Sequence, residues 1–162
     1  MAINQIYAVG AALVDTEVTV SDSFLSGQGI EKGIMTLVDQ SRQAELLDAL
    51  NSSEACILQQ SGGSACNSVV AAAQFGANSC FGGKVANDAD GALFASDLKQ
   101  ANVQFYSAQS ETGITGKCLV MITDDAERTM NTYLGVSDAF SEDEIDHNAL
   151  IASEWFYIEG YL

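Results

Sequence analysis

The stretch GGSACNSVVAAAQFGANSCFGGKVANDADGALFASDLKQANV, residues 62–103, decides the fold class of this chain. Its two leading glycines are followed at 64–75 by small residues that predict a helix able to pack closely on a sheet, and Gly76 ends that helix. Residues 79–85 then have the pattern of a strand, and 90–101 have the pattern of an amphipathic helix. Strands that alternate with helices in this way predict an α/β fold with a largely parallel sheet.

Further segments on both sides of this stretch continue the alternation. Strand patterns cover 3–9, 12–20, 33–39, 115–123, 128–134 and 155–158, and helix patterns cover 42–50, 141–146 and 147–153. Ser41 is the expected N-cap of the helix at 42–50, whereas 57–60 is too short to assign. The last strand leaves Glu159 just beyond its carboxyl end, which is where ligand sites of parallel α/β sheets lie.

The composition is that of a globular domain with a strong negative charge. The chain has 162 residues, 48% of them hydrophobic, and its 22 acidic against 6 basic residues give a formal charge of −16. So few basic side chains cannot neutralise a phosphate backbone or hold an anionic lipid surface, which excludes nucleic acid and membranes as partners. The N-terminal residues lack a basic region and no apolar run reaches about 18 residues, which predicts a cytoplasmic protein.

The cysteines and the single histidine do not have the pattern of a metal site. Cys56, Cys66, Cys80 and Cys118 lie at spacings unlike those of metal ligands or redox pairs, and the histidine is His147. In a cytoplasmic chain these thiols are expected to be reduced and buried as small apolar side chains.

Asp15 is the first candidate for binding chemistry. It follows the apolar residues 11–14, so we expect it to be buried and to need a hydrogen-bond donor. Two alternatives stay open at this point. Backbone N–H groups at a strand end could satisfy the carboxylate, or its two oxygens could accept hydrogen bonds from both hydroxyls of a vicinal diol.

The segment Gly62-Gly63-Ser64-Ala65-Cys66-Asn67 is the second candidate. Two glycines before a helix allow another group to approach the backbone closely, and the helix start offers free N–H groups. The residue types alone slightly favour a tight turn in which Asn67 caps nearby backbone. The alternative is a ligand that contacts the glycines and the Asn67 amide.

Arg128 is one of few cations, and it follows the acidic run at 124–127. A local ion pair is the expected role of Arg128, and a phosphate contact is the alternative. The acidic runs at 124–127 and 142–144 lack the spacing of a calcium loop and are expected to be solvated surface.

Five features in order resemble the amino-terminal half of the ribokinase-like carbohydrate kinases, the PfkB family, and within it the adenosine kinase-like branch. They are Gly10 with Asp15, GGSACNSVVAAAQFGA (62–77), GGKVANDADGALFASDLKQANV (82–103), TGKCLVMITDDAERTMNTYLG (115–135) and FYIEGYL (156–162). The resemblance covers essentially the whole chain. One departure is Gly10-Ala11, where the family commonly has Gly-Asn, and this change could alter contacts to the sugar or base.

The resemblance implies a ribokinase-like α/β fold with a small β-sheet lid, drawn here from segments near 12–38 and 112–134. Residues 1–162 would be the N-terminal half of the kinase domain. The C-terminal half, with the catalytic base and the sites for ATP and Mg, would be absent, so this half alone would be inactive. The complete protein would transfer phosphate from ATP to a primary hydroxyl of a nucleoside or sugar, as a monomer or homodimer.

The resemblance also implies roles for individual residues. Asp15, Gly62-Gly63 and Asn67 would hold the ribose hydroxyls, Glu159 would contact the sugar, and Arg128 would lie near the transferred phosphate. Residues that line the nucleoside pocket would be Leu13, Ser64, Cys118, Met130, Leu134 and Tyr161. Two alternatives remain: a sugar kinase of the ribokinase or fructokinase type, and a non-catalytic binding module whose natural gene ends near residue 162.

Overall fold

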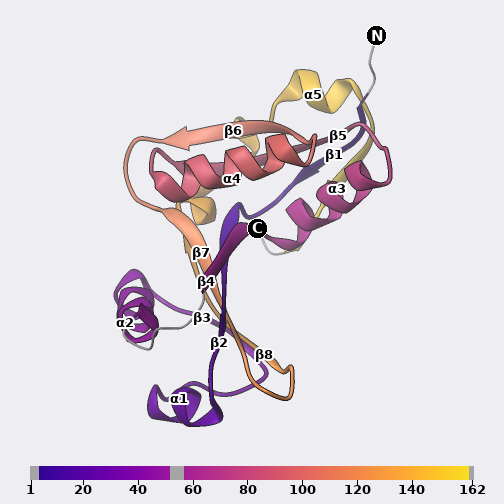
Figure 1. Ribbon diagram of the computed structural model, residues 1–162. Coiled ribbons are helices and arrows are strands. Elements are labelled where there is room, and N and C mark those ends of the chain that lie inside the picture. Colours follow the sequence, from indigo (N-terminus) through magenta and orange to yellow (C-terminus); the bar gives the residue numbers. More distant parts are fainter. Residues whose placement is uncertain (1–3, 52–56, 161–162) are drawn as a thin grey trace.

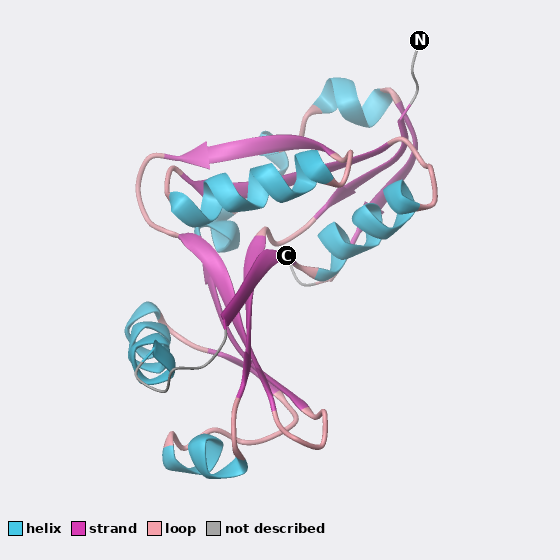
Figure 2. Cartoon of the chain, viewed as in Figure 1, coloured by secondary structure: helices cyan, strands magenta, loops and turns pink. Residues whose placement is uncertain are grey.

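The computed structural model describes residues 4–51 and 57–160, which form two sheets in two adjoining lobes (Figure 1; Figure 2). We call them the parallel sheet, with strand order β6-β5-β1-β9, and the mixed sheet, with strand order β3-β8-β7-β2-β4. In Figure 1 the long strand β2 (Leu13–Thr19) leaves the lobe of the parallel sheet and runs along the mixed sheet. The predicted α/β class, with a parallel sheet flanked by helices, is confirmed.

The parallel sheet consists of β1 (Asn4–Val9), β5 (Ser79–Ala86), β6 (Gln104–Ser110) and β9 (Ser153–Ile158). All of its strand pairs are parallel. β1 and β5 lie in the centre of the sheet, which explains why their apolar residues are consecutive rather than alternating.

Helices cover both faces of the parallel sheet. α3 (Ser64–Gln74) and α4 (Ala89–Gln100) lie on one face, where Phe81 and Phe94 are fully buried (Figure 1). The short helix α5 (His147–Ile151) packs on the other face, over Tyr7 and Cys80.

The mixed sheet consists of β2, β3 (Met35–Leu37), β4 (Ile57–Gly62), β7 (Thr115–Ile122) and β8 (Arg128–Gly135). Helices α1 (Asp22–Gly27) and α2 (Gln40–Asn51) cover one of its faces. Leu25 of α1 and Leu46 of α2 are buried there with Leu119 and Met121 of β7. The opposite face of the mixed sheet is left to line a cavity.

The observed secondary structure differs from the predicted one in several elements. Strand β6 and helix α1 have no counterpart among the predicted elements, because the sequence of β6 is mostly polar and α1 is a short serine-rich turn of helix. Two 3₁₀ turns, η1 (Val136–Ala139) and η2 (Glu142–Glu144), precede α5, and the second replaces the helix predicted at 141–146. The N-cap hydrogen bond of α2 comes from Asp39 Oδ1, which accepts from Arg42 N at 2.8 Å, rather than from Ser41.

The unassigned segment at 57–60 belongs to β4, which pairs antiparallel with β2. Its residues Leu58–Gln60 are exposed, so the apolar pattern that would reveal the strand is weak. The predicted strand at 3–9 corresponds to β1 from Asn4 onward, and residue 3 lies outside the described residues.

Strand β9 forms an edge of the parallel sheet and exposes large apolar side chains. The exposed fractions are 71% for Trp155, 42% for Phe156 and 56% for Ile158. An edge strand with this composition is normally paired or covered in an α/β domain. In the part of the chain described, no helix is long and apolar enough to cross a membrane.

Candidate functional site

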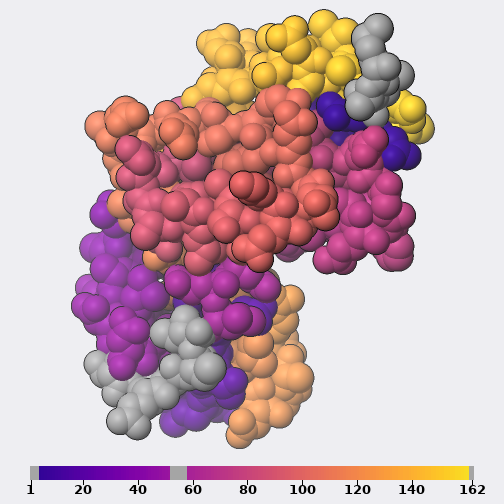
Figure 3. All heavy atoms as spheres, turned by 45° about the horizontal axis from the view of Figure 1, so that its top comes forward, coloured from indigo at the N-terminus to yellow at the C-terminus, as the bar shows by residue number. Residues whose placement is uncertain are grey.

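A cavity of about 600 Å³ lies where the mixed sheet meets the carboxyl end of the parallel sheet. Its lining residues are Gly10, Ala11, Leu13, Asp15, Met35, Leu37, Gly63, Ser64, Asn67, Cys118, Arg128, Met130, Thr132, Leu134, Asp138 and Glu159. In Figure 3 the atoms of α3 (magenta) overhang those of β8 (light orange) and leave the molecule hollowed between the two lobes. A concave, largely apolar site of this size is typical of small-molecule ligands.

Asp15 contributes a carboxylate to this cavity from the middle of β2. Desolvation raises the pKa of its carboxyl group from 3.8 to about 6, although the guanidinium of Arg128 acts in the opposite direction. No donor among the described residues hydrogen-bonds this carboxylate. The first alternative for Asp15, hydrogen bonds from backbone N–H groups, is thus not found in the described part of the chain. The carboxylate is available to accept hydrogen bonds from a ligand, as in the second alternative.

Gly62 and Gly63 fit the backbone around Asp15 in two different ways. A Cβ atom on Gly62 would lie 2.2 Å from Asp15 Cγ, so only glycine leaves room for the carboxyl group. Gly63 has a φ of 94°, and a Cβ atom there would lie 2.3 Å from the carbonyl oxygen of Ala11. The two glycines therefore allow α3 to start against the segment that joins β1 to β2.

The first turn of α3 lies at the edge of the cavity. Asn67 is exposed there, and its side-chain amide has no hydrogen-bond partner among residues 4–51 and 57–160. The interpretation in which this amide caps nearby backbone is therefore wrong for the described residues. Gly63 caps the helix without a side-chain hydrogen bond, which leaves the backbone amides of the first turn without a side-chain acceptor.

The cavity face of the mixed sheet changes from acidic to apolar across its strands. Asp15 of β2 lies opposite Cys118 of β7. Cys118 in turn lies opposite Thr132 of β8, which pairs with Leu37 of β3. A ligand on this face would meet a carboxylate on one side and aliphatic side chains on the other.

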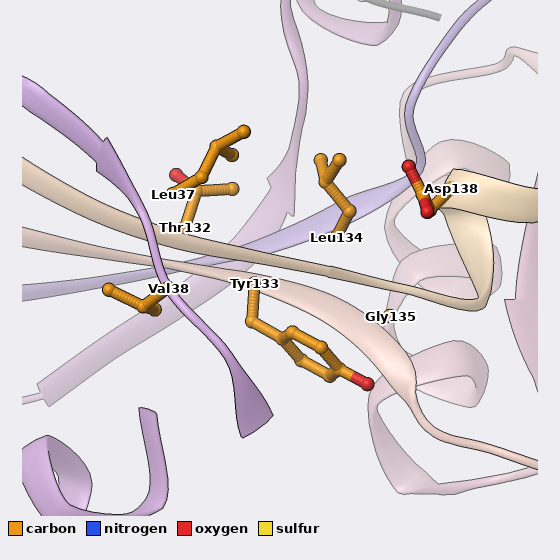
Figure 4. A pocket seen from close by; sticks show the side chains of 7 residues that line it. All are labelled: Leu37, Val38, Thr132, Tyr133, Leu134, Gly135 and Asp138. Carbon is orange, nitrogen blue, oxygen red and sulfur yellow. The ribbon is translucent and has the colours of Figure 1, made fainter. Parts of the chain in front are cut away.

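A smaller cavity of about 340 Å³ adjoins the edge of β8 beyond the end of β3. It shares Leu37, Thr132, Leu134 and Asp138 with the larger cavity. Figure 4 shows the first three of these side chains on one side of the strands and Tyr133 on the opposite side. The larger cavity is thus continuous with a hollow along this edge of the mixed sheet.

Glu159 reaches the cavity from just beyond β9. Its carboxylate accepts hydrogen bonds from the hydroxyls of Ser64 and Tyr157. Asp15 and Asp138 are the other carboxylates in the lining, which contains one guanidinium. This charge distribution favours neutral, donor-rich ligands over anions.

The family follows from a direct match. Residues 33–162 match the model of the pfkB family of carbohydrate kinases. The chain belongs to this family. No curated protein sequence matches the chain.

Solved structures of other kinases are similar to this pfkB chain. An adenosine kinase from Sinorhizobium meliloti is 32% identical, with a TM-score of 0.90 and 99% of this chain covered. A probable sugar kinase from Rhizobium etli CFN 42 is 30% identical, with a TM-score of 0.91 and 100% of this chain covered. Adenosine kinase from Schistosoma mansoni in complex with adenosine, at 20% identity, a TM-score of 0.85 and 99% of this chain covered, shows the fold alone. The chain spans 48% of each of these three structures, about half their length.

The pfkB fold brings most of the predicted site residues around one cavity. Those that line it are Leu13, Asp15, Gly63, Ser64, Asn67, Cys118, Arg128, Met130, Leu134 and Glu159. Gly62 lies directly against Asp15 rather than in the lining, and Tyr161 lies outside the described residues. The binding roles of all these residues stay predictions.

Six lining residues were not among the predicted site residues: Gly10, Ala11, Met35, Leu37, Thr132 and Asp138. Period-two alternation within the predicted strands could have identified Thr132, because it lies between Met130 and Leu134 on the same face of β8. Asp138 belongs to a 3₁₀ turn that no sequence pattern marks.

The ion pair expected for Arg128 is wrong for the described residues. The acidic turn that precedes Arg128 is instead bound by Lys32, whose Nζ lies 2.8 Å from Asp125 Oδ2 and 2.7 Å from Asp22 Oδ1. Arg128 is therefore left to line the cavity near Asp15.

Three cysteines follow the prediction of buried, unpaired thiols: Cys66, Cys80 and Cys118 are free and buried. Burial raises the pKa of the Cys66 thiol to about 12 and that of the Cys118 thiol to about 11. Both thiols are therefore protonated at neutral pH. Cys56 lies outside the described residues.

ATP and magnesium, the cofactors that the family resemblance implies, do not fit the residues described here. Lys32, Arg42, Lys84 and Lys117 each form an ion pair with a carboxylate, so few cationic groups are left for a triphosphate. In the described ranges no three His, Cys, Asp or Glu side chains are grouped to hold a metal ion.

Proposed function

We propose that this chain is the acceptor-binding half of an ATP-dependent kinase that phosphorylates a primary hydroxyl of a neutral nucleoside or sugar, with a ribonucleoside as the preferred substrate. The observation that carries the proposal is the Asp15 carboxylate. It lies in a cavity large enough for a small-molecule ligand, borders an apolar face of the mixed sheet, and accepts no hydrogen bond from the described residues.

The residues of the cavity match the parts of a ribonucleoside. Asp15 accepts hydrogen bonds from the vicinal ribose hydroxyls, and Asn67 with the backbone at Gly63 supplies further polar contacts. The base lies over the apolar side chains of Met130 and Leu134. The carboxylates in the lining disfavour an acidic sugar as substrate, because its carboxylate would be repelled.

The mixed sheet serves as a lid in this proposal. Its strands come from the segments near 12–38 and 112–134 that the family resemblance assigns to a lid, together with β4. Near the parallel sheet it is anchored, because Val14 of β2 shares a buried core with Phe81 and Phe94. The rest of the mixed sheet projects away from the parallel sheet, and bending beyond the anchored part would close it over the acceptor (Figure 1). Closure excludes water, so the acceptor hydroxyl rather than solvent attacks the nucleotide.

ATP and its magnesium ion are held by a second half of the domain in this proposal. Two observations support such a half: the similar kinases are about twice as long as this chain, and β9 exposes aromatic side chains along an edge of the parallel sheet. Phosphoryl transfer depends on groups that position the γ-phosphate and stabilise its charge. Residues 1–162 by themselves are therefore expected to be inactive.

ATP consumption with a panel of acceptors tests the proposal. The panel contains adenosine, inosine, ribose, fructose and a ketodeoxy acid sugar, and the enzyme is the complete protein with the second half that its relatives have. We expect a neutral nucleoside to give the highest kcat/KM, and residues 1–162 to give no turnover. An acid sugar as the best substrate, turnover by residues 1–162 alone, or a coding sequence that stops directly after residue 162 would contradict it.

A further inference from the structure

The carboxylate of Glu159 is held by two hydroxyl groups from different parts of the chain. Tyr157 Oη donates to Oε1 at 2.7 Å, and Ser64 Oγ donates to Oε2. Ser64 is the first residue of α3, and Tyr157 lies on the edge strand β9. Glu159 therefore bridges the start of α3 to the end of β9 at the wall of the cavity.

Tyr157 lies on the side of the parallel sheet where α3 packs. Phe156, the residue before it, places its ring 5.7 Å from the ring of Tyr7, on the face covered by α5. Because side chains alternate along a strand, Tyr157 points to the opposite face. The Tyr157 hydroxyl there also lies beside Ser68 of α3, whose own hydroxyl donates to the carbonyl oxygen of Ser64 at 2.8 Å.

The Tyr157 hydroxyl is a donor that stays protonated. The hydrogen bond that this phenol donates to the Glu159 carboxylate raises the pKa of Tyr157 above its ordinary value, because a phenolate could not donate it. Tyr157 therefore keeps the proton that it donates to Glu159 at neutral pH.

Glu159 needs such a tether to stay in the cavity. Asp15 and Asp138 line the same cavity, so the lining that receives Glu159 already contains two carboxylates. A glutamate side chain loses rotamer entropy when it is fixed. Without the two hydroxyls, this entropy favours a Glu159 side chain turned to solvent.

We propose that Tyr157 is a positioning residue for acceptor binding: together with Ser64 it fixes the Glu159 carboxylate at the α3 end of the cavity, so that hydroxyls of the acceptor meet carboxylates from both sheets. This inference rests on the proposed kinase function. It assigns a role to a residue of the edge strand that does not itself line the cavity.

Steady-state kinetics of the complete enzyme test this role. Tyr157→Phe removes only the hydroxyl and is expected to raise the KM for the acceptor about tenfold, the effect of losing one hydrogen bond to a charged group, while kcat changes less than about twofold. Tyr106→Phe is the matched control, because it removes a tyrosine hydroxyl from β6, away from the cavity lining, and its KM is expected to be that of the wild type.

A double-mutant cycle separates positioning from general damage. If Tyr157 acts only through Glu159, adding Tyr157→Phe to a Glu159→Ala enzyme changes KM less than about twofold, whereas independent effects multiply. Ser64→Ala, which removes the other tether, is expected to raise KM as Tyr157→Phe does and replaces that variant if it fails to fold.

The outcomes distinguish this inference from the proposed function. A wild-type enzyme that phosphorylates none of the acceptors contradicts the proposed function and removes the basis of the inference. An active wild type with an unchanged KM for Tyr157→Phe, or with multiplicative effects in the Glu159→Ala background, overturns the positioning role and leaves the proposed function intact.

Discussion

Replacing Asp15 with asparagine is expected to stabilise the chain at neutral pH. The carboxylate lies in the cavity without a hydrogen-bond donor from the described residues, and desolvation raises the pKa of its carboxyl group from 3.8 to about 6. The folded state therefore binds this proton more tightly than the unfolded state does. Ionisation of Asp15 opposes folding, and an uncharged amide of the same shape removes that opposition.

The size of the effect follows from the two pKa values. A change from 3.8 to about 6 corresponds to about 3 kcal/mol of differential interaction. Asp15 is only half-buried, so water in the cavity reduces the effect, and we expect about 1–2 kcal/mol. The penalty is absent below about pH 4, develops as the pH rises toward 6, and is complete above about pH 7.

Urea unfolding of residues 1–162 at pH 4.5 and pH 7.5 measures this difference. We expect Asp15→Asn to raise the free energy of unfolding at pH 7.5 and to have a much smaller effect at pH 4.5, with an unchanged m-value. Asp124→Asn is the control, because it removes one negative charge from an exposed turn outside the cavity. A wild type more stable than Asp15→Asn at pH 7.5, or a difference independent of pH, would show that ionised Asp15 does not oppose folding.

Three further predictions concern stability. Gly63→Ala is expected to lower the free energy of unfolding by about 2 kcal/mol more than Gly76→Ala, because both glycines have a φ of 94° but only the first meets a backbone oxygen, at 2.3 Å; equal losses in urea unfolding would contradict this. Asp88→Ala is expected to cost about 2–4 kcal/mol, because Asp88 caps α4 and accepts two hydrogen bonds from Thr115, and a loss below about 1 kcal/mol would count against that role. Added NaCl, from about 0.05 M to 0.5 M, is expected to raise the melting temperature by several degrees, because a formal charge of −16 repels itself and salt screens it; a lower melting temperature would contradict this.

The sequence predicts the parts of the fold that depend on continuous apolar runs and on turn residues. β1, β5, α3 and α4 appear within a residue or two of their predicted bounds, because burial on both faces of a parallel sheet leaves a strong local pattern. β6 and β4 lack that pattern. They are edge strands of their sheets and are held mainly by backbone pairing, which side-chain patterns do not reveal.

The site is predicted best where one residue carries its own signal. The sequence alone identifies Asp15, because it follows an apolar run, and the glycine pair, because it precedes a helix. The fit of the Asp15 carboxyl group against Gly62 depends instead on the pairing of β2 with β4, which no local pattern predicts. The ion-pair partner of Arg128 was predicted wrongly because Lys32 is 93 residues from Asp125 in the sequence. Contacts of that range are set by topology and not by local pattern.

Transfer of phosphate from ATP to the 5′-hydroxyl of adenosine by the complete protein, compared between the wild type and Asp15→Asn, tests the central claim most directly. We expect the variant to fold and to be at least as stable as the wild type at neutral pH. Its KM for adenosine is expected to rise about 100-fold or more, since both hydrogen bonds to the charged carboxylate are weakened. A KM equal to that of the wild type would contradict the assignment of Asp15, and with it the account of this cavity as the acceptor site.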